Sequence, residues 1–232
     1  MLPIRDNVPT RTFPLMTFAL IAANTAVWLW ELRSPGLDIH VYRYSFYPCS
    51  VDPPCVTDVS QLRDLPWTES VFSSMFMHGS WAHLLGNMLF LWIFGNNVED
   101  AMGKLRFLVF YLLGGLAASA VQLFVTIAFA SQAEASIPNL GASGAIAAVL
   151  GAYFVLLPTA SVMTFIGFFL VPLPAILFLG FWFLFQLWEG GFAIVHPEAG
   201  GGVAFFALVG GFAFGLATVM AFIVRRPLRP RW

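Results

Sequence analysis

The chain contains 232 residues, of which 59% are hydrophobic and only 10% are charged. Soluble domains carry roughly 25% charged residues, so this composition excludes an ordinary soluble protein and indicates an integral membrane protein. The formal net charge of −1 gives no basis for a nucleic-acid partner, and none is expected. The whole chain, 1–232, is interpreted as a single membrane domain whose first expected partner is the lipid bilayer.

Six apolar segments each approach the roughly 20 residues that a helix needs to cross a bilayer. The sequence therefore predicts an all-α membrane protein with spans at approximately 13–32, 71–97, 105–130, 141–158, 161–189 and 201–224. Arginines lie in the leading segment 1–12 and in the basic tail 225–232. Because basic residues accumulate on the cytoplasmic side, both termini are predicted to be cytoplasmic and the protein to lie in a cell (inner) membrane.

The long segment 33–70 is predicted to lie on the outer side, where its aromatic residues suit the layer of lipid headgroups. It contains the only two cysteines of the chain, Cys49 and Cys55. The sequence leaves two alternatives open for them, a short disulfide loop on the oxidising side or two free thiols.

The second predicted span contains the polar run His78-Gly79-Ser80-Trp81-Ala82-His83-Leu84-Leu85-Gly86-Asn87. His83 and Asn87 are four residues apart and therefore share one helix face. Unpaired polar groups are costly in an apolar span, so a functional role is the default hypothesis, and a structural hydrogen bond is the alternative. His78 and His83 do not share a helix face and no acidic or thiol ligand accompanies them, so neither a metal site nor a cofactor is predicted.

The fourth span opens with Gly141-Ala142-Ser143-Gly144. A serine between glycines at a helix start has an uncrowded hydroxyl, and the first helical N–H groups can donate to a developing negative charge. This pattern suits a nucleophile beside part of an oxyanion hole. The alternative is that Ser143 only caps the helix and that the glycines allow close helix packing.

The depths of these residues are consistent with one site. At 1.5 Å per residue, His83 and Ser143 each lie about 21–22 Å above the cytoplasmic ends of their spans. Leu208 lies about 10 Å below the outer end of the sixth span, at a similar depth. Small-residue faces on the two helices predict that the sixth helix packs on the fourth with Leu208 facing Ser143. The stripe on the fourth helix comprises Ser143, Ala147 and Gly151, and that on the sixth comprises Ala207, Gly211 and Gly215. Leu208 lies beside the second stripe, because it shares a helix face with Gly211 and Gly215.

With these motifs the chain resembles the rhomboid family of intramembrane serine proteases. The resemblance rests on the run from His78 to Asn87, its continuation to Glu99, the Gly141–Gly144 tetrapeptide and the segment Gly210-Gly211-Phe212-Ala213-Phe214-Gly215. It implies a six-helix bundle with a wet cavity among the second, fourth and sixth helices. It also implies that segment 33–70 is a membrane-associated first loop, braced by a polar network that includes Glu99.

The resemblance further implies the roles of the site residues. Ser143 would be the nucleophile, and the oxyanion would be bound by His83, Asn87 and the backbone near Ser143 and Gly144. Family members carry Ala-His before the glycines of the last helix, and that histidine is the base. Here the segment reads Ala207-Leu208, so the base position is occupied by leucine.

No other histidine substitutes obviously for the missing base. His196 precedes position 208 by twelve residues, which is about 18 Å along a continuous helix. The sequence therefore predicts a rhomboid-type serine endopeptidase scaffold, inactive or severely impaired, that acts on or binds the transmembrane segments of other proteins. Two alternatives remain: a pseudoprotease that binds transmembrane clients, and an active protease with an unrecognised base.

Overall fold

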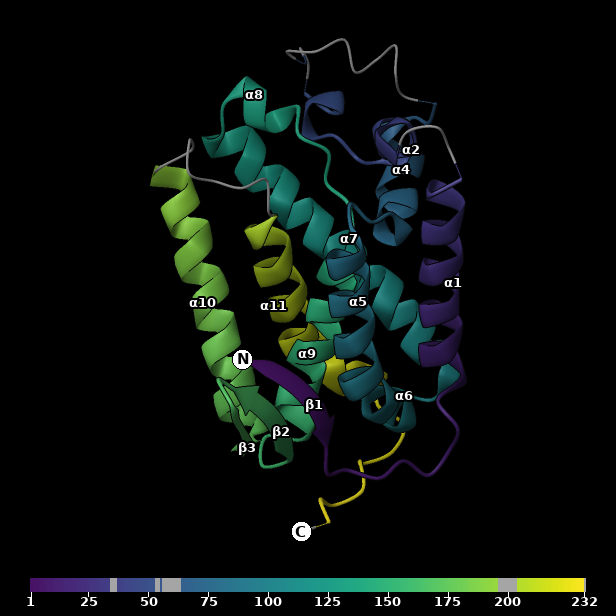
Figure 1. Ribbon diagram of the computed structural model, residues 1–232, viewed down its shortest axis with the longest axis vertical. Helices are drawn as coiled ribbons and strands as arrows, with labels where there is room; N and C mark the ends of the chain where they lie inside the picture. Colours follow the sequence, from purple (N-terminus) through teal and green to yellow (C-terminus); the bar gives the residue numbers. More distant parts are fainter. Residues whose placement is uncertain (34–36, 53–54, 56–63, 196–203, 232) are drawn as a thin grey trace.

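The computed structural model describes residues 1–33, 37–52, 55, 64–195 and 204–231. Most of the long helices run along the long axis of the molecule (Figure 1). A π-helical turn, η3 (Leu91–Gly95), joins α5 (Trp81–Phe90) to α6 (Asn96–Met102) without a break. The helices are α1 (Leu15–Glu31), α2 (Leu37–Tyr44), α4 (Trp67–Ser73), α5 (Trp81–Phe90), α6 (Asn96–Met102), α7 (Lys104–Phe129), α8 (Gln132–Ala135), α9 (Ser143–Leu156), α10 (Ala175–Val195) and α11 (Phe205–Phe222), with short 3₁₀ turns η1 (Pro48–Ser50) and η2 (Ser74–Phe76).

Within the described residues, three helices are long and apolar enough to cross a membrane: α7, Ala175–Phe192 of α10, and α11. Helices α1 and α9 are apolar but shorter. The predicted start of the second span at residue 71 is wrong, because the chain turns between Met77 and Ser80. Ser80 then caps α5 by accepting a hydrogen bond from the backbone N–H of His83.

The fifth predicted span, 161–189, is also wrong in its first half. Residues 161–174 form an antiparallel hairpin of β2 (Ser161–Ile166) and β3 (Phe169–Pro174), and α10 begins only at Ala175. In the N-terminal segment, Leu2–Asp6 forms β1, which pairs with β2. A three-stranded sheet in the order β1-β2-β3 therefore lies at the end of the helix bundle that carries the two termini (Figure 1).

Helix α9 is buried along most of its length, from Gly144 to Tyr153. Helix α11 packs directly on it, as predicted for the fourth and sixth spans. A Cβ atom added at Gly211 or Gly215 would overlap a backbone carbonyl oxygen of α9, that of Gly144 or Ala148. The face of closest approach thus begins at Gly144 and Ala148, one residue beyond the predicted Ser143 and Ala147.

Carboxylates join the chain ends to α6. Asp100 forms ion pairs of 3.0 Å with Arg11, which precedes α1, and 2.9 Å with Arg225, which follows α11. The Glu99 carboxylate accepts hydrogen bonds at 3.0 and 2.8 Å from the backbone N–H groups of Met16 and Thr17. Glu99 thus stabilises the first turn of α1. Its hydrogen bonds among the described residues go to α1 and not to the segment 33–70, which the resemblance implied it would brace.

The strand β1 is held at the same end by a third carboxylate. Asp6 accepts hydrogen bonds of 2.6 Å from the Asn97 side-chain amide and from the Tyr153 hydroxyl of α9. Burial raises the pKa of Asp6 from its ordinary 3.8 to about 6, although the hydrogen bond from Tyr153 opposes the shift. The groups at this end are called the terminal polar cluster below; they are Asp6, Arg11, Asn97, Glu99, Asp100 and Arg225.

The predicted outer segment lies at the opposite end of the bundle (Figure 1). Cys49 and Cys55 form a disulfide, which decides between the two alternatives left open by the sequence. The backbone of Phe46 exchanges hydrogen bonds of 3.3 and 2.7 Å with that of Asn139 in an isolated bridge, so the predicted outer segment is joined to the loop that leads into α9. Residues 34–36, 53–54 and 56–63 of the predicted loop lie outside the described residues.

Candidate active site

The first residue of α9, Ser143, has a hydroxyl group that neither caps the helix nor forms another hydrogen bond among the described residues. Gly141 has φ of 112°, a conformation that favours glycine, and turns the chain into the helix. The N-cap position is Ala142, and no side chain caps the helix. The alternative that Ser143 is an N-cap is therefore wrong. Within the described part of the chain, the Ser143 hydroxyl forms no hydrogen bond.

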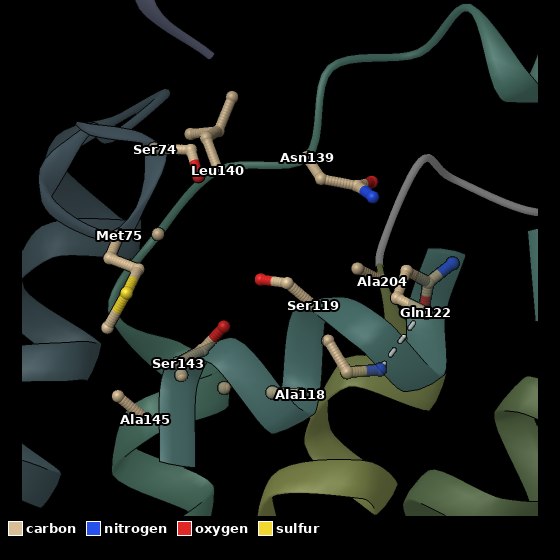
Figure 2. A pocket seen from close by; sticks show the side chains of 14 residues that line it. Ser74, Met75, Ala118, Ser119, Gln122, Asn139, Leu140, Ser143, Ala145 and Ala204 are labelled. Carbon is tan, nitrogen blue, oxygen red and sulfur yellow. Dashed lines mark hydrogen bonds between the residues drawn. The ribbon is translucent and has the colours of Figure 1, made fainter. Parts of the chain in front are cut away.

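Ser143 lines a small cavity of about 40 Å³, sufficient for a water molecule. The cavity lies between α7, α9, α11 and η2 (Figure 2). Figure 2 shows the hydroxyl groups of Ser119 and Ser143 turned toward one another across it. Gln122 supports the wall, because its Oε1 accepts a hydrogen bond of 3.1 Å from the backbone N–H of Ala207.

His83 and Asn87, on α5, lie beside the turn that precedes Ser143. A Cβ atom added at Gly141 would lie 2.6 Å from Nε2 of His83 and 3.7 Å from Nδ2 of Asn87. With the backbone as it is, only glycine can occupy position 141 without displacing the His83 ring, and the positive φ independently favours glycine there. The structure therefore brings the polar run of α5 and the Gly141–Gly144 tetrapeptide together.

His78 orients Asn87. Nδ1 of His78 lies 3.1 Å from the carbonyl oxygen of Phe76, and its Nε2 lies 3.1 Å from Nδ2 of Asn87. A neutral ring with the proton on Nδ1 satisfies both contacts, because Nδ1–H donates to Phe76 and Nε2 accepts from Asn87. The backbone N–H of His78 donates in turn to the buried Glu31 carboxylate of α1, at 3.3 Å.

The sequence analysis treated His78 and His83 as residues of one helix, which is wrong. His78 precedes α5, so its ring contacts that of His83, with 5.1 Å between the ring centroids. The fully buried His78 is thus a partner of Asn87 that spacing alone did not reveal.

The cavity wall also contains polar residues of α7 that the sequence analysis missed, Ser119 and Gln122. Both lie inside an apolar span, three residues apart on one helix face. The argument from the cost of polar groups in a membrane, which identified His83 and Asn87, also applies to these two residues.

Position 208 lies on the α11 side of this region. Leu208 is half-buried against the apolar core, one turn before Gly211, which meets the carbonyl oxygen of Gly144. No acidic or basic side chain is among the described residues that line the cavity. His196, which precedes α11 in the sequence, lies outside the described residues.

Comparison with known proteins identifies the family to which this architecture belongs. Residues 66–226 match the rhomboid domain model. The chain is 35% identical over 153 residues to presenilin-associated rhomboid-like protein A, mitochondrial, of Danio rerio, covering 66% of this chain and 34% of that protein. It is 34% identical over 154 residues to rhomboid protein 1, mitochondrial, of Saccharomyces cerevisiae, covering 65% of this chain and 39% of that protein.

A plant relative, RHOMBOID-like protein 5 of Arabidopsis thaliana, is 34% identical over 82 residues, covering 35% of this chain and 25% of that protein. The chain thus spans little more than a third of the length of the mitochondrial relatives. The domain match nevertheless covers more than half of the chain and includes α5, α9 and α11. This protein belongs to the rhomboid family of membrane proteins.

Proposed function

We propose that this chain is a rhomboid-type intramembrane serine endopeptidase scaffold whose activity is absent or severely impaired because position 208 is leucine. The observation that carries the proposal is the contact of His83 with the turn at Gly141, next to the unbonded hydroxyl of Ser143. In this proposal six helical segments cross the membrane: α1, the continuous α5–η3–α6, α7, α9, α10 and α11.

Each polar group of the proposed site would have a role in peptide-bond cleavage. The Ser143 oxygen would attack the scissile carbonyl carbon, and the carbonyl oxygen would take the negative charge. His83, the Asn87 amide and the free N–H groups of Ser143 and Gly144 would donate to that oxygen. The hydrogen bond that the Asn87 amide donates to His78 fixes the amide in advance, so less reorganisation is needed when the charge develops.

The proposed site lacks a base that could remove the proton from the Ser143 hydroxyl. A serine hydroxyl is a weak nucleophile near neutral pH unless a base accepts its proton. Leucine has no such acceptor, and loss of the histidine in a soluble serine protease costs about 10⁶ in kcat. We expect a penalty of similar size in this site, with a residual contribution from the oxyanion donors.

The substrates or clients would be membrane proteins whose transmembrane segments reach the outer end of α9. The two ends of the chain lie together, since the backbone N–H of Arg231 donates to the carbonyl oxygen of Asn7 at 3.1 Å. We propose that this end is cytoplasmic, as the basic residues indicate, in a cell membrane. The mitochondrial names of the relatives make a mitochondrial membrane the competing location, and imaging of the tagged protein distinguishes the two.

The decisive experiment restores the base. Purified wild type, Leu208→His and the double variant Leu208→His with Ser143→Ala are reconstituted with a transmembrane substrate that has a helix-destabilising segment near the outer surface. Leucine and histidine have similar volumes, so the ring fits without overpacking. We expect background cleavage by the wild type, cleavage at least about 10²-fold faster by Leu208→His, and none by the double variant. Leu208→Asn is the matched control, because it adds polarity without a base.

The other outcomes identify the alternatives. Ser143-dependent cleavage by the wild type contradicts the proposal and requires an unrecognised base. An inactive Leu208→His that still crosslinks to the substrate favours a pseudoprotease that binds transmembrane clients. Labelling of wild-type Ser143 by a serine-directed covalent probe gives a second readout, and strong labelling opposes an inactive site.

A further inference from the structure

The β2–β3 hairpin carries an unusual apolar surface outside the helix bundle. Gly167, with φ of 60°, forms its turn, and Phe168 beside it is 94% exposed. Phe169 and Leu170 follow on β3 and are 73% and 57% exposed. Large contiguous apolar surfaces of this kind mark a site of contact with another molecule or with a membrane.

The apolar surface continues across the sheet. Phe165 of β2 pairs directly with Leu170 of β3 and with Leu2 of β1, and directly paired residues in antiparallel strands share one face. All three side chains are exposed. The opposite face carries the buried Val162 and Thr164 and is turned to the protein. The hairpin surface comprises the exposed face, with Leu2, Phe165 and Leu170, and the tip of the hairpin, with Phe168 in the turn and the exposed pair Ile166 and Phe169 that flanks it.

The hairpin surface adjoins the exposed apolar side of α10. The backbone N–H of Ala175, the first residue of α10, donates to the carbonyl oxygen of Ala160, the residue before β2, at 2.7 Å. The exposed apolar side chains of α10 begin immediately, with Ile176 and Leu177. Along the long axis, the sheet lies at the level of the first turns of α10 and does not project beyond the bundle (Figure 1).

The composition of this region agrees with a lipid neighbour. From residue 135 to residue 188 the chain contains no Asp, Glu, Lys, Arg or His. Edge strands that face water usually carry charges, which prevent pairing with other chains, whereas the edge strand β3 carries only apolar residues and two prolines. Aromatic side chains are favoured where a protein meets the boundary between headgroups and acyl chains.

From the exposed apolar row, its junction with α10 and the absence of charge, we propose that the β2–β3 hairpin lies in the bilayer interface and inserts Phe168 and Phe169 among the lipid acyl chains. The sheet thereby extends the membrane-embedded surface of the protein sideways from the base of α10. Six residues of β3 reach about 20 Å, so the hairpin anchors the protein to lipid well away from the helix axes.

A fluorescence experiment tests the insertion. Phe168→Cys is labelled with an environment-sensitive fluorophore under non-reducing conditions, in which the Cys49–Cys55 disulfide does not react. Matched labels are placed at Leu184→Cys, an exposed position within α10, and at Arg229→Cys, an exposed position in the C-terminal tail. All three are reconstituted in phosphatidylcholine–phosphatidylglycerol vesicles with and without brominated acyl chains.

We expect brominated lipid to quench the label at 168 to at least about half the extent seen at 184, with little quenching at 229. A label at 168 that is open to aqueous iodide and unaffected by brominated lipid, as at 229, overturns the proposal. The same measurement at an about tenfold lower protein-to-lipid ratio excludes a second copy as the occupant, because protein contacts weaken on dilution. Quenching by lipid that appears only after dilution would show that a second copy covers the hairpin, and would also overturn the proposal.

Discussion

The two ends of the helix bundle differ in how completely their polar groups are hydrogen-bonded. In the terminal polar cluster each carboxylate has at least two partners, as Asp100 has in Arg11 and Arg225. At the serine end, Ser143 has no hydrogen-bond partner among the described residues, and the buried Nδ2 of Asn139 in the cavity wall has none either. Paired groups stabilise the fold, whereas unpaired groups are available to a ligand or a reacting atom.

The difference also separates stability from chemistry along single helices. The continuous α5–η3–α6 places His83 and Asn87 near one end and Glu99 near the other. Helix α9 likewise begins with Ser143 and reaches Tyr153, which donates to Asp6. Substitutions at the terminal polar cluster should therefore change the free energy of unfolding, whereas substitutions at the serine end should change the cleavage activity of the Leu208→His variant.

The largest effect on stability is expected at Asp100. Asp100→Ala removes the shared partner of two arginines that join the chain ends to α6, and it should lower the free energy of unfolding by about 3 kcal/mol. Thermal unfolding in detergent micelles measures the change. Asp64→Ala is the matched control, because the Asp64 ion pair with Arg43 at 3.7 Å is half exposed and should contribute less than about 1 kcal/mol. Equal effects for the two variants would remove the distinction between the ends.

A pH-dependent effect of similar size is expected at Asp6. The folded protein raises the pKa of Asp6 from 3.8 to about 6, so the folded state binds this proton more tightly than the unfolded state. The contribution of Asp6 to stability is therefore greatest below pH 4, falls as the pH rises to 6 and is constant above, a change of about 3 kcal/mol. The difference in unfolding temperature between wild type and Asp6→Asn, measured from pH 4 to 8, isolates this group. A constant difference over that range would contradict the shift.

The smallest effect on stability is expected at the serine. Ser143→Ala removes a hydroxyl without hydrogen bonds and should change the free energy of unfolding by less than about 0.5 kcal/mol. Thr17→Ala removes a hydroxyl of similar size whose Oγ1 donates to Glu99 at 2.8 Å, and should cost about 1.5 kcal/mol. If Ser143→Ala proved as costly as Thr17→Ala, the serine would have a structural role that the hydrogen bonds do not reveal.

The sequence predicted the helices that carry the site, and the reason is physical. In a membrane, polar residues such as His83 and Asn87 are rare enough that each signals a role, and small residues such as Gly211 mark close helix contacts. The positions of α1, α7, α9 and α11 followed from hydropathy to within a few residues.

Hydropathy failed where an apolar segment was not a helix. The run from 161 to 188 is mostly apolar and contains no charged residue, and a buried or lipid-facing strand cannot be distinguished from a helix by polarity alone. Pro172 and Pro174 were the available signals, because proline disfavours a helix interior and suits an edge strand. The partners of Asp6 and Asp100 could not be predicted, because these contacts join segments separated by about ninety residues or more.

The glycine contacts between α9 and α11 have a consequence for substitutions in the proposed site. Backbone packs against backbone at Gly211 and Gly144, so the relative placement of the two helices does not depend on the side chain one turn away at 208. A change at position 208 therefore alters chemistry and leaves the geometry in place, whereas a change at 211 forces the helices apart. If the proposed site is correct, a single base change, from some leucine codons to a histidine codon at position 208, would supply the base that we propose is missing, for as long as the glycines persist.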